Sequence, residues 1–310
     1  MLHFADRVSE AVQRKGTPLC VGLDPRWESL PEEVRRRHGG SSLESVADAY
    51  EEFCNRVIDI VAGLVAVVKP QSAFFEACGP AGLTALQHVL RRARERGLIT
   101  LLDGKRNDIA STATAYADAA LAGVTFEERR FPVWEADALT VNPYLGRDAV
   151  EPFLQSARRC AGGVFVLVRT SNPGAGQFQD LVTTRPGSAE PGRPLFLHVA
   201  EAVRAWAREN LGVCGLGDVG AVVGATYPEE LALLRKELPE VLFLIPGFGA
   251  QGGKADDVTA GFRPDGLGAL VNSSRAILFP GDPADPAWEH RVEKATRDVI
   301  AALPRVGQHP

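Results

Sequence analysis

Residues 98–109 read LITLLDGKRNDI, an apolar run followed directly by a cluster of charged residues. The run is typical of a buried strand, and Asp103 and Lys105, two residues apart after it, are expected to point to the same face. A carboxylate beside an ammonium at the end of a strand is costly to desolvate unless it is used, although an ordinary surface ion pair in a loop would have the same sequence. The rest of the chain favours a functional ion pair over an ordinary surface pair, because it repeats the pattern of an apolar strand that ends in a polar residue.

Short apolar runs of this kind recur eight times along the 310 residues. Most are rich in Val, Ile and Leu without polar alternation, which is typical of strands buried on both faces. They cover residues 19–23, 64–68, 99–102, 138–141, 164–168, 221–223, 241–245 and 267–271. Amphipathic helices are predicted between them, most clearly over 46–60, 82–94 and 228–238. Eight alternating strand and helix units predict an α/β fold, a closed (β/α)8 TIM barrel.

We expect residues 1–310 to form this barrel as a single catalytic domain. An open, doubly wound sheet is the alternative, and it would favour a G-x-G-x-x-G turn after an early strand, which the sequence lacks. Inserted loops are predicted near 29–42, 124–135 and 172–194. The last is rich in Gly and Pro and follows the fifth strand, so it is either a mobile lid or a plain surface excursion.

Composition excludes several classes of protein. The formal net charge is −5, so there is no basic surface for nucleic acid, and the apolar runs are too short to span a bilayer. The N-terminus has no signal-peptide layout, and we expect a cytoplasmic protein without a membrane partner. The five cysteines form no C-x-x-C pair, and with the six histidines they show no metal-ligand spacing. They are interpreted as buried structural thiols, and no metal site is expected.

Charged residues follow several of the predicted strands. In a barrel these positions line one mouth, where active sites lie. Asp24, Lys69, Asp103 and Lys105 would therefore meet there with alternating sign, and two of the six lysines of the chain are among them. The segments 169–171, 246–253 and 272–275 reach the same mouth after later strands.

A phosphate site is predicted after the last two strands. The loop PGFGAQGG at 246–253 is rich in glycine, and its backbone N–H groups are suited to bind an anion. Arg275 follows the next strand and could add a bidentate guanidinium. A tight turn that needs glycine for its backbone conformation is the alternative for the loop taken alone.

The segment DGKRNDI at 103–109 also matches the D-x-K-x-x-D-I signature of the orotidine 5'-phosphate decarboxylase family. VGLDP at 21–25, VKP at 68–70, the 246–253 loop and SRAI at 274–277 match the same family in the same order. The chain thus resembles this family over about residues 15–280, and RTSNP at 169–173 is similar to its longer bacterial subgroup. The resemblance implies decarboxylation of orotidine 5'-phosphate to uridine 5'-phosphate and CO2, the last step of de novo pyrimidine (UMP) biosynthesis, by a homodimer without metal or organic cofactor.

The resemblance also implies a role for each matching residue. Lys105 would donate the proton to C6 of the pyrimidine, Asp103 would lie beside the departing carboxylate, and Lys69 would flank Asp103. Asp108 would complete this catalytic set from the neighbouring subunit, although its place before a helix near Ser111 is also that of an N-cap. The resemblance implies that Asp24 and Lys69 hold the ribose hydroxyls, with Thr112 contributing across the interface. It also implies that Ser171 binds the pyrimidine, and that Gln251 and Arg275 bind the 5'-phosphate.

Three other functions remain open at this stage. A sibling barrel with the same D-x-K-x-x-D pattern could act on sugar phosphates as a decarboxylase or aldolase-like synthase, but it would need a divalent metal. Lys105 or Lys69 could form a Schiff base, which requires a depressed pKa that neighbouring carboxylates oppose. A barrel that binds a nucleotide without turnover is the third.

Overall fold

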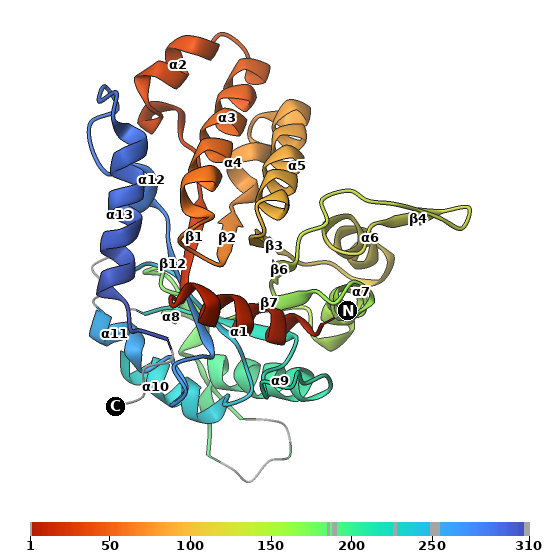
Figure 1. Cartoon of the computed structure of the whole chain (residues 1–310). Helices are drawn as coiled ribbons and strands as arrows, with labels where there is room; N and C mark the ends of the chain where they lie inside the picture. Colours follow the sequence, from red (N-terminus) through yellow and green to blue (C-terminus); the bar gives the residue numbers. More distant parts are fainter. Residues whose placement is uncertain (1, 185–186, 188–190, 226–227, 249–254, 307–310) are drawn as a thin grey trace.

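Eight parallel strands close into a barrel in this computed structural model, which describes residues 2–184, 187, 191–225, 228–248 and 255–306 (Figure 1). The order around the barrel is β1-β12-β11-β10-β7-β6-β3-β2, so the first and last strands are neighbours. The strands are β1 (Leu19–Leu23), β2 (Val67–Pro70), β3 (Ile99–Arg106), β6 (Ala138–Val141), β7 (Gly163–Arg169), β10 (Val219–Val223), β11 (Phe243–Ile245) and β12 (Ala269–Ser273). The predicted closed barrel is confirmed, and the open-sheet alternative is wrong.

Helices surround the barrel and alternate with its strands. They are α1 (Phe4–Lys15), α2 (Glu32–His38), α3 (Leu43–Val61), α4 (Ser72–Glu76), α5 (Gly79–Glu95), α6 (Ala110–Ala120), α7 (Arg147–Arg159), α8 (Gly176–Gln179), α9 (Leu195–Arg208), α10 (Pro228–Glu237), α11 (Ala255–Thr259), α12 (Arg275–Leu278) and α13 (Trp288–Ala302), with a short 3-10 helix at Trp27–Ser29. The three helices predicted most clearly are confirmed as α3, α5 and α10. No helix of the described residues is long and apolar enough to cross a membrane.

The apolar core has two layers, as buried parallel strands require. Side chains such as Cys20, Leu101 and Phe165 fill the inside of the barrel. A larger set, including Phe53 and Phe153, packs between the outside of the barrel and the helices. Because each strand contributes to both layers, its sequence is apolar without alternation.

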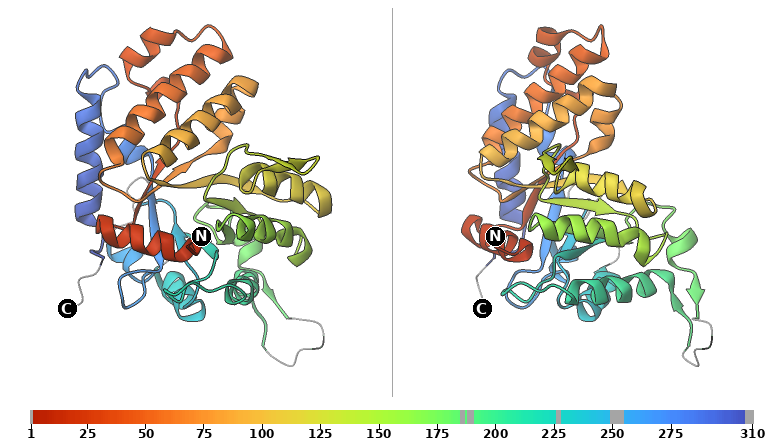
Figure 2. Two further views of the ribbon diagram at one scale, coloured as in Figure 1. Left: turned by 45° about the vertical axis from the view of Figure 1, so that its right-hand side comes forward. Right: turned by 90° about the vertical axis from the view of Figure 1, so that its right-hand side faces the viewer.

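The N-terminal helix α1 closes one end of the barrel (Figures 1 and 2). Its Phe4 ring meets Phe165 of the barrel interior edge-on, with 6.2 Å between the ring centroids. Arg7 on the same helix forms an ion pair with Asp137, just before β6, at 2.8 Å. This end carries the N-terminal ends of the strands, so the open mouth lies at their C-terminal ends.

The three predicted insertions all contain secondary structure. Helix α2 lies within 29–42, and an antiparallel hairpin of β4 (Val124–Phe126) and β5 (Arg129–Phe131) projects from the barrel within 124–135 (Figure 1). The segment 172–194 contains α8 and a second antiparallel pair, β8 (Val182–Thr183) with β9 (Arg193–Pro194). A lid function for this segment stays a prediction.

All five cysteines are free, and Cys20, Cys54 and Cys78 are buried as expected. Cys160 and Cys214 are only partly buried, which corrects the expectation for these two. Burial raises the pKa of Cys20 to about 12, so its thiol stays protonated and unreactive at neutral pH.

Candidate active site

Asp103 is the centre of the site at the open mouth of the barrel. It lies on β3 and is 6% exposed. The Lys69 ammonium on the neighbouring strand β2 binds its Oδ2 at 2.6 Å, and the Lys105 ammonium binds its Oδ1 at 2.6 Å. One buried carboxylate is therefore held between two ammonium groups, as charge pairing of a buried group requires.

Two residues that the sequence analysis missed complete the shell of Asp103. The Thr140 hydroxyl on β6 donates to Oδ1 at 2.9 Å, and the Gln71 amide, directly after β2, donates to Oδ2 at 3.1 Å. Each could have been noticed as a polar residue in or just after an apolar run. Neither has a charge or a motif to single it out, and only the barrel brings both to Asp103.

The electrostatics of this cluster favour the charged forms of Asp103 and Lys69. Burial alone would raise the pKa of Asp103, but the Lys69 and Lys105 ammonium groups outweigh it and hold that pKa well below its usual range. Burial alone would lower the pKa of Lys69, but the charges of Asp103 and Asp24 outweigh it and raise that pKa. A protonated Lys69 is a poor nucleophile, so this geometry argues against Lys69 as a Schiff-base residue.

A cavity of about 390 Å³ opens above this cluster. It brings together four of the predicted site residues, Asp24, Lys69, Asp103 and Arg275. The Oδ1 atom of Asp24 is buried there without a hydrogen-bond partner among the described residues. Because buried acceptors are normally satisfied, this oxygen is suited to accept a hydrogen bond from a ligand hydroxyl.

The other predicted residues differ in position. Lys105 is not among the residues that line the cavity, but its ammonium is paired with Asp103, which does line it, and its side chain is 47% exposed. Ser171 follows β7 and is partly buried, but it is not among the residues that line the cavity. Thr112, on the first turn of α6, is exposed and also lies outside the cavity lining. Gln251 lies outside the described residues.

Asp108 does not cap helix α6 in the manner expected of an N-cap. The helix begins at Ala110, its N-cap residue is Ile109, and no side chain caps it. The Asp108 carboxylate instead accepts a hydrogen bond from the Ile109 N–H at 2.8 Å. Asp108 is not among the residues that line the cavity of its own chain.

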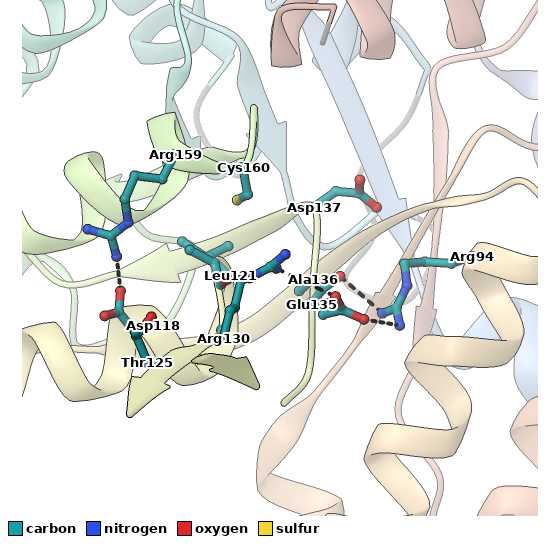
Figure 3. Close-up of a pocket in the computed structure, with 12 residues that line it drawn as sticks. Arg94, Asp118, Leu121, Thr125, Arg130, Glu135, Ala136, Asp137, Arg159 and Cys160 are labelled. Atoms are coloured by element: carbon teal, nitrogen blue, oxygen red, sulfur yellow. Dashed lines mark hydrogen bonds and ion pairs between the residues drawn. The ribbon is translucent and has the colours of Figure 1, made fainter. Parts of the chain in front are cut away.

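A larger cavity, of about 720 Å³, lies at the opposite end of the strands (Figure 3). Its charged side chains are paired within the protein: Arg94 with Glu135, Arg159 with Asp118, and Asp137 with Arg7. Active sites of barrels lie at the C-terminal ends of the strands, and this cavity lies at the N-terminal ends. The smaller cavity is therefore the candidate active site.

Among the described residues, no group of three or more His, Cys, Asp or Glu side chains is placed to hold a metal ion. The Asp103 carboxylate in particular has both oxygens engaged by ammonium, hydroxyl and amide donors.

Comparison with known proteins identifies the family to which this chain belongs. A sequence model of the orotidine 5'-phosphate decarboxylase / HUMPS family matches residues 17–289, from β1 to the start of α13. The chain belongs to this family. Residues 103–109, on which the resemblance in the sequence rests, lie within this match.

Relatives with the name orotidine 5'-phosphate decarboxylase align over most of the chain. That of Rhodopirellula baltica is 53% identical over 279 residues, 90% of this chain and 89% of the relative. That of Deinococcus radiodurans is 42% identical over 277 residues, 89% of each. Both relatives thus align with about nine tenths of this chain.

Solved structures of similar proteins superpose on nearly the whole chain. The structure of OMP decarboxylase from Leishmania donovani superposes with a TM-score of 0.71 at 35% identity, covering 97% of this chain and 96% of that one. The UMP synthase of the same organism superposes with a TM-score of 0.73 at 35% identity, covering 97% of this chain and 57% of that longer one.

Proposed function

We propose that this chain decarboxylates orotidine 5'-phosphate to uridine 5'-phosphate and CO2, the last step of de novo pyrimidine biosynthesis. The observation that carries the proposal is the buried Asp103 carboxylate held between Lys69 and Lys105 at the mouth of the barrel. Family membership and the names of relatives up to 53% identical support the same reaction.

The charges of the site fit the demands of this reaction. Loss of CO2 breaks the bond from C6 to the carboxylate and leaves the electron pair on C6, where no neighbouring carbonyl accepts it. A preorganised cation beside C6 stabilises this charge, and the partly exposed Lys105 ammonium is suited to that place. The same group then supplies the proton to C6 and is reprotonated from water. We assign no metal and no organic cofactor to the reaction.

Asp103 and Lys69 position the Lys105 ammonium and balance its charge. Asp103 holds the Lys105 ammonium at 2.6 Å and places negative charge beside the carboxylate that leaves as neutral CO2. Lys69 balances Asp103 from the other side, so the buried carboxylate stays ionised while Lys105 gives up its proton. Asp24, with its unpartnered Oδ1, is assigned to the ribose with Lys69.

The remaining contacts are assigned by position. Arg275, after β12, and Gln251 are assigned to the 5'-phosphate, and Ser171 to the pyrimidine ring. The phosphate is remote from C6, so its binding energy can order the site for the chemical step as well as hold the substrate.

We propose further that two copies share their active sites, with Asp108 and Thr112 entering the partner's site. Neither residue is among those that line the cavity of their own chain. Beside them on the same surface Ile109 is 55% exposed and Tyr116 is 41% exposed, apolar area that a second subunit would cover.

The deciding experiment follows the loss of orotidine 5'-phosphate absorbance with protein treated exhaustively with EDTA. We expect full activity and formation of uridine 5'-phosphate. Activity that returns only on addition of Mg²⁺ would contradict a metal-free reaction. Inertness toward orotidine 5'-phosphate with turnover of a keto-sugar phosphate would favour the sibling barrels, and binding of the nucleotide without turnover would favour the third alternative.

A further inference from the structure

Arg26 and Arg275 leave the barrel rim from adjacent strands. Strands β1 and β12 pair in parallel, with Cys20 opposite Asn272. Arg26 follows the end of β1 by three residues, and Arg275 follows the end of β12 by two. Both line the cavity of about 390 Å³ that holds Asp103. Ring closure therefore places two guanidinium groups at one edge of the candidate active site.

Neither guanidinium group is satisfied within the described part of the chain. Arg26 and Arg275 are both exposed, and no ion pair or side-chain hydrogen bond joins either to another described residue. Among the described residues, two carboxylates line the cavity, Asp24 and Asp103, and Asp103 is already bound by both lysines. Elsewhere in the protein exposed arginines such as Arg92 and Arg147 have carboxylate partners. The cavity thus has an excess of positive charge, which favours an anion.

The Arg26 guanidinium also contacts an aromatic ring. Its guanidinium carbon lies over the ring of Phe74 on α4, at 5.2 Å from the centroid. A guanidinium group that contacts an aromatic ring through its face keeps its N–H edges free. Those edges form the paired hydrogen bonds by which arginine binds phosphate.

We propose that Arg26 binds the 5'-phosphate of the substrate together with Arg275. This inference rests on the proposed function, because the phosphate belongs to the nucleotide. A phosphate monoester carries a charge of about −1.5 to −2 near pH 7, which one guanidinium group does not balance. Two guanidinium groups from neighbouring strands balance it, and Phe74 orients the second of them.

The kinetic test compares three variants with the wild type. Arg26→Ala should lower kcat/KM for orotidine 5'-phosphate by about 10- to 100-fold, mainly through KM, because a charge-assisted contact to the phosphate is lost. Arg26→Lys keeps the positive charge but lacks the two parallel N–H donors of a guanidinium group. Its kcat/KM should lie between those of Arg26→Ala and the wild type. Arg91→Ala removes the same charge from an exposed position on α5, outside the cavity, and should leave kcat/KM unchanged.

Substrate without the phosphate separates this role from a structural one. With the phosphate-free nucleoside orotidine, Arg26→Ala and the wild type should turn over at the same rate. Phe74→Leu removes the ring face but no charge and should raise KM for orotidine 5'-phosphate in the same direction by a smaller factor. An equal loss on both substrates, or no change in KM for orotidine 5'-phosphate in Arg26→Ala, overturns the proposal.

A binding measurement keeps this inference independent of turnover. Titration calorimetry with inorganic phosphate should give a Kd about tenfold weaker for Arg26→Ala than for the wild type and for Arg91→Ala. If the wild type does not decarboxylate orotidine 5'-phosphate, the proposed function fails, and this titration alone decides the role of Arg26. Equal phosphate affinity in all three proteins, or no phosphate binding by the wild type, overturns it.

Discussion

At the scale of single residues, the position of Lys105 depends on an unusual backbone conformation. Its φ is +44°, in the left-handed region that a residue with a side chain rarely adopts. The pairing of β3 with β6 shifts its register between Leu102 and Arg106, and the Lys105 N–H donates to the Thr140 hydroxyl at 2.9 Å. Such a conformation costs about 1–3 kcal/mol and is found at functional sites. Here it lets Lys69 and Lys105 reach opposite oxygens of Asp103.

Lys105→Ala should lower kcat for orotidine 5'-phosphate by at least about 10⁴-fold, because it removes the group proposed as both the proton donor and the cation beside C6. The Kd of uridine 5'-phosphate should change much less, since the phosphate and ribose contacts remain. Single-turnover kinetics and product titration measure the two effects. Lys294→Ala is the control, because it removes an exposed lysine of α13 whose partner is Asp298. A kcat loss below tenfold would remove Lys105 from the chemistry.

The lowered pKa of Asp103 also predicts a pH-dependent stability. A carboxylate whose pKa is depressed by folding stabilises the protein above its unfolded pKa, and this contribution is lost as the pH falls through the folded value. Asp103→Asn leaves Lys69 buried without its partner and should lower the free energy of unfolding at pH 7 by about 3–5 kcal/mol. The difference from the wild type should shrink as the pH falls below about 4. Urea unfolding between pH 7 and pH 2 measures it, and a difference that grows toward low pH would contradict the sign.

At the scale of elements, the seam between β1 and β12 requires a glycine. An added Cβ on Gly22 would lie 1.9 Å from the Ser274 hydroxyl and 3.2 Å from Oδ1 of Asn272. Both of these polar side chains line the candidate active site, and Ser274 directly precedes Arg275. The missing side chain at Gly22 therefore leaves room beside β1 for the side chains of Asn272 and Ser274.

Gly22→Ala should displace Ser274 and lower the free energy of unfolding by about 1–3 kcal/mol. The KM for orotidine 5'-phosphate should rise as well, because Arg275 follows the displaced residue. Gly63→Ala is the matched control: no atom lies within 4 Å of its added Cβ, and the change should stay within about 0.5 kcal/mol. Chemical denaturation and initial rates check both variants, and a Gly22→Ala protein as stable as the control would show that the seam can relax.

At the scale of the whole molecule, the two ends of the barrel differ, because one is closed by a helix and the other carries the candidate active site. The closed end is held by α1, whose buried Asp6 accepts hydrogen bonds from the Val213 N–H at 3.0 Å and the Cys214 N–H at 2.8 Å. Burial alone would raise the pKa of Asp6, but the hydrogen bonds from the Cys214 and Val213 backbone outweigh burial, and the pKa is lowered. The open end holds the ion network of Asp103.

Asp6→Ala should therefore lower stability without lowering activity. The loss should be about 1–3 kcal/mol, because two N–H donors lose their acceptor. The kcat for orotidine 5'-phosphate should be unchanged, since Asp6 lies at the end of the barrel away from the mouth. Thermal unfolding and initial rates measured on the same preparation test this, and a kcat loss above about tenfold would show that the closed end shapes the site.

The proposed sharing of active sites is tested by mixing two inactive proteins. Lys105→Ala and Asp108→Ala chains should each be nearly inactive, and their subunits are dissociated together and reassembled. In a mixed dimer one site collects both defects and the other has none, so random pairing should restore about a quarter of wild-type activity. If Asp108 serves its own chain, no activity returns even where mass measurement confirms mixed dimers.

The sequence by itself predicted the alternation of strands and helices and the closed barrel, because strands buried on both faces carry uninterrupted Val, Ile and Leu. It also predicted the Asp103 and Lys105 pair, since both lie in one short segment. The predicted C-terminal ends of three strands were wrong. The strands β2, β3 and β12 continue through polar residues that were expected to follow them. The reason is that the hydrogen bonds between strands join backbone groups, whatever the side chains are.

Only the tertiary structure brought Thr140 and Gln71 to Asp103, and Arg26 beside Arg275 at one cavity. These residues are uncharged or lie far apart in the sequence, so no local pattern links them. Their proximity depends on the order of strands around the barrel, in which closure makes β1 and β12 neighbours although about 250 residues separate them. Contacts of this kind follow from the packing of the complete ring and not from any one segment.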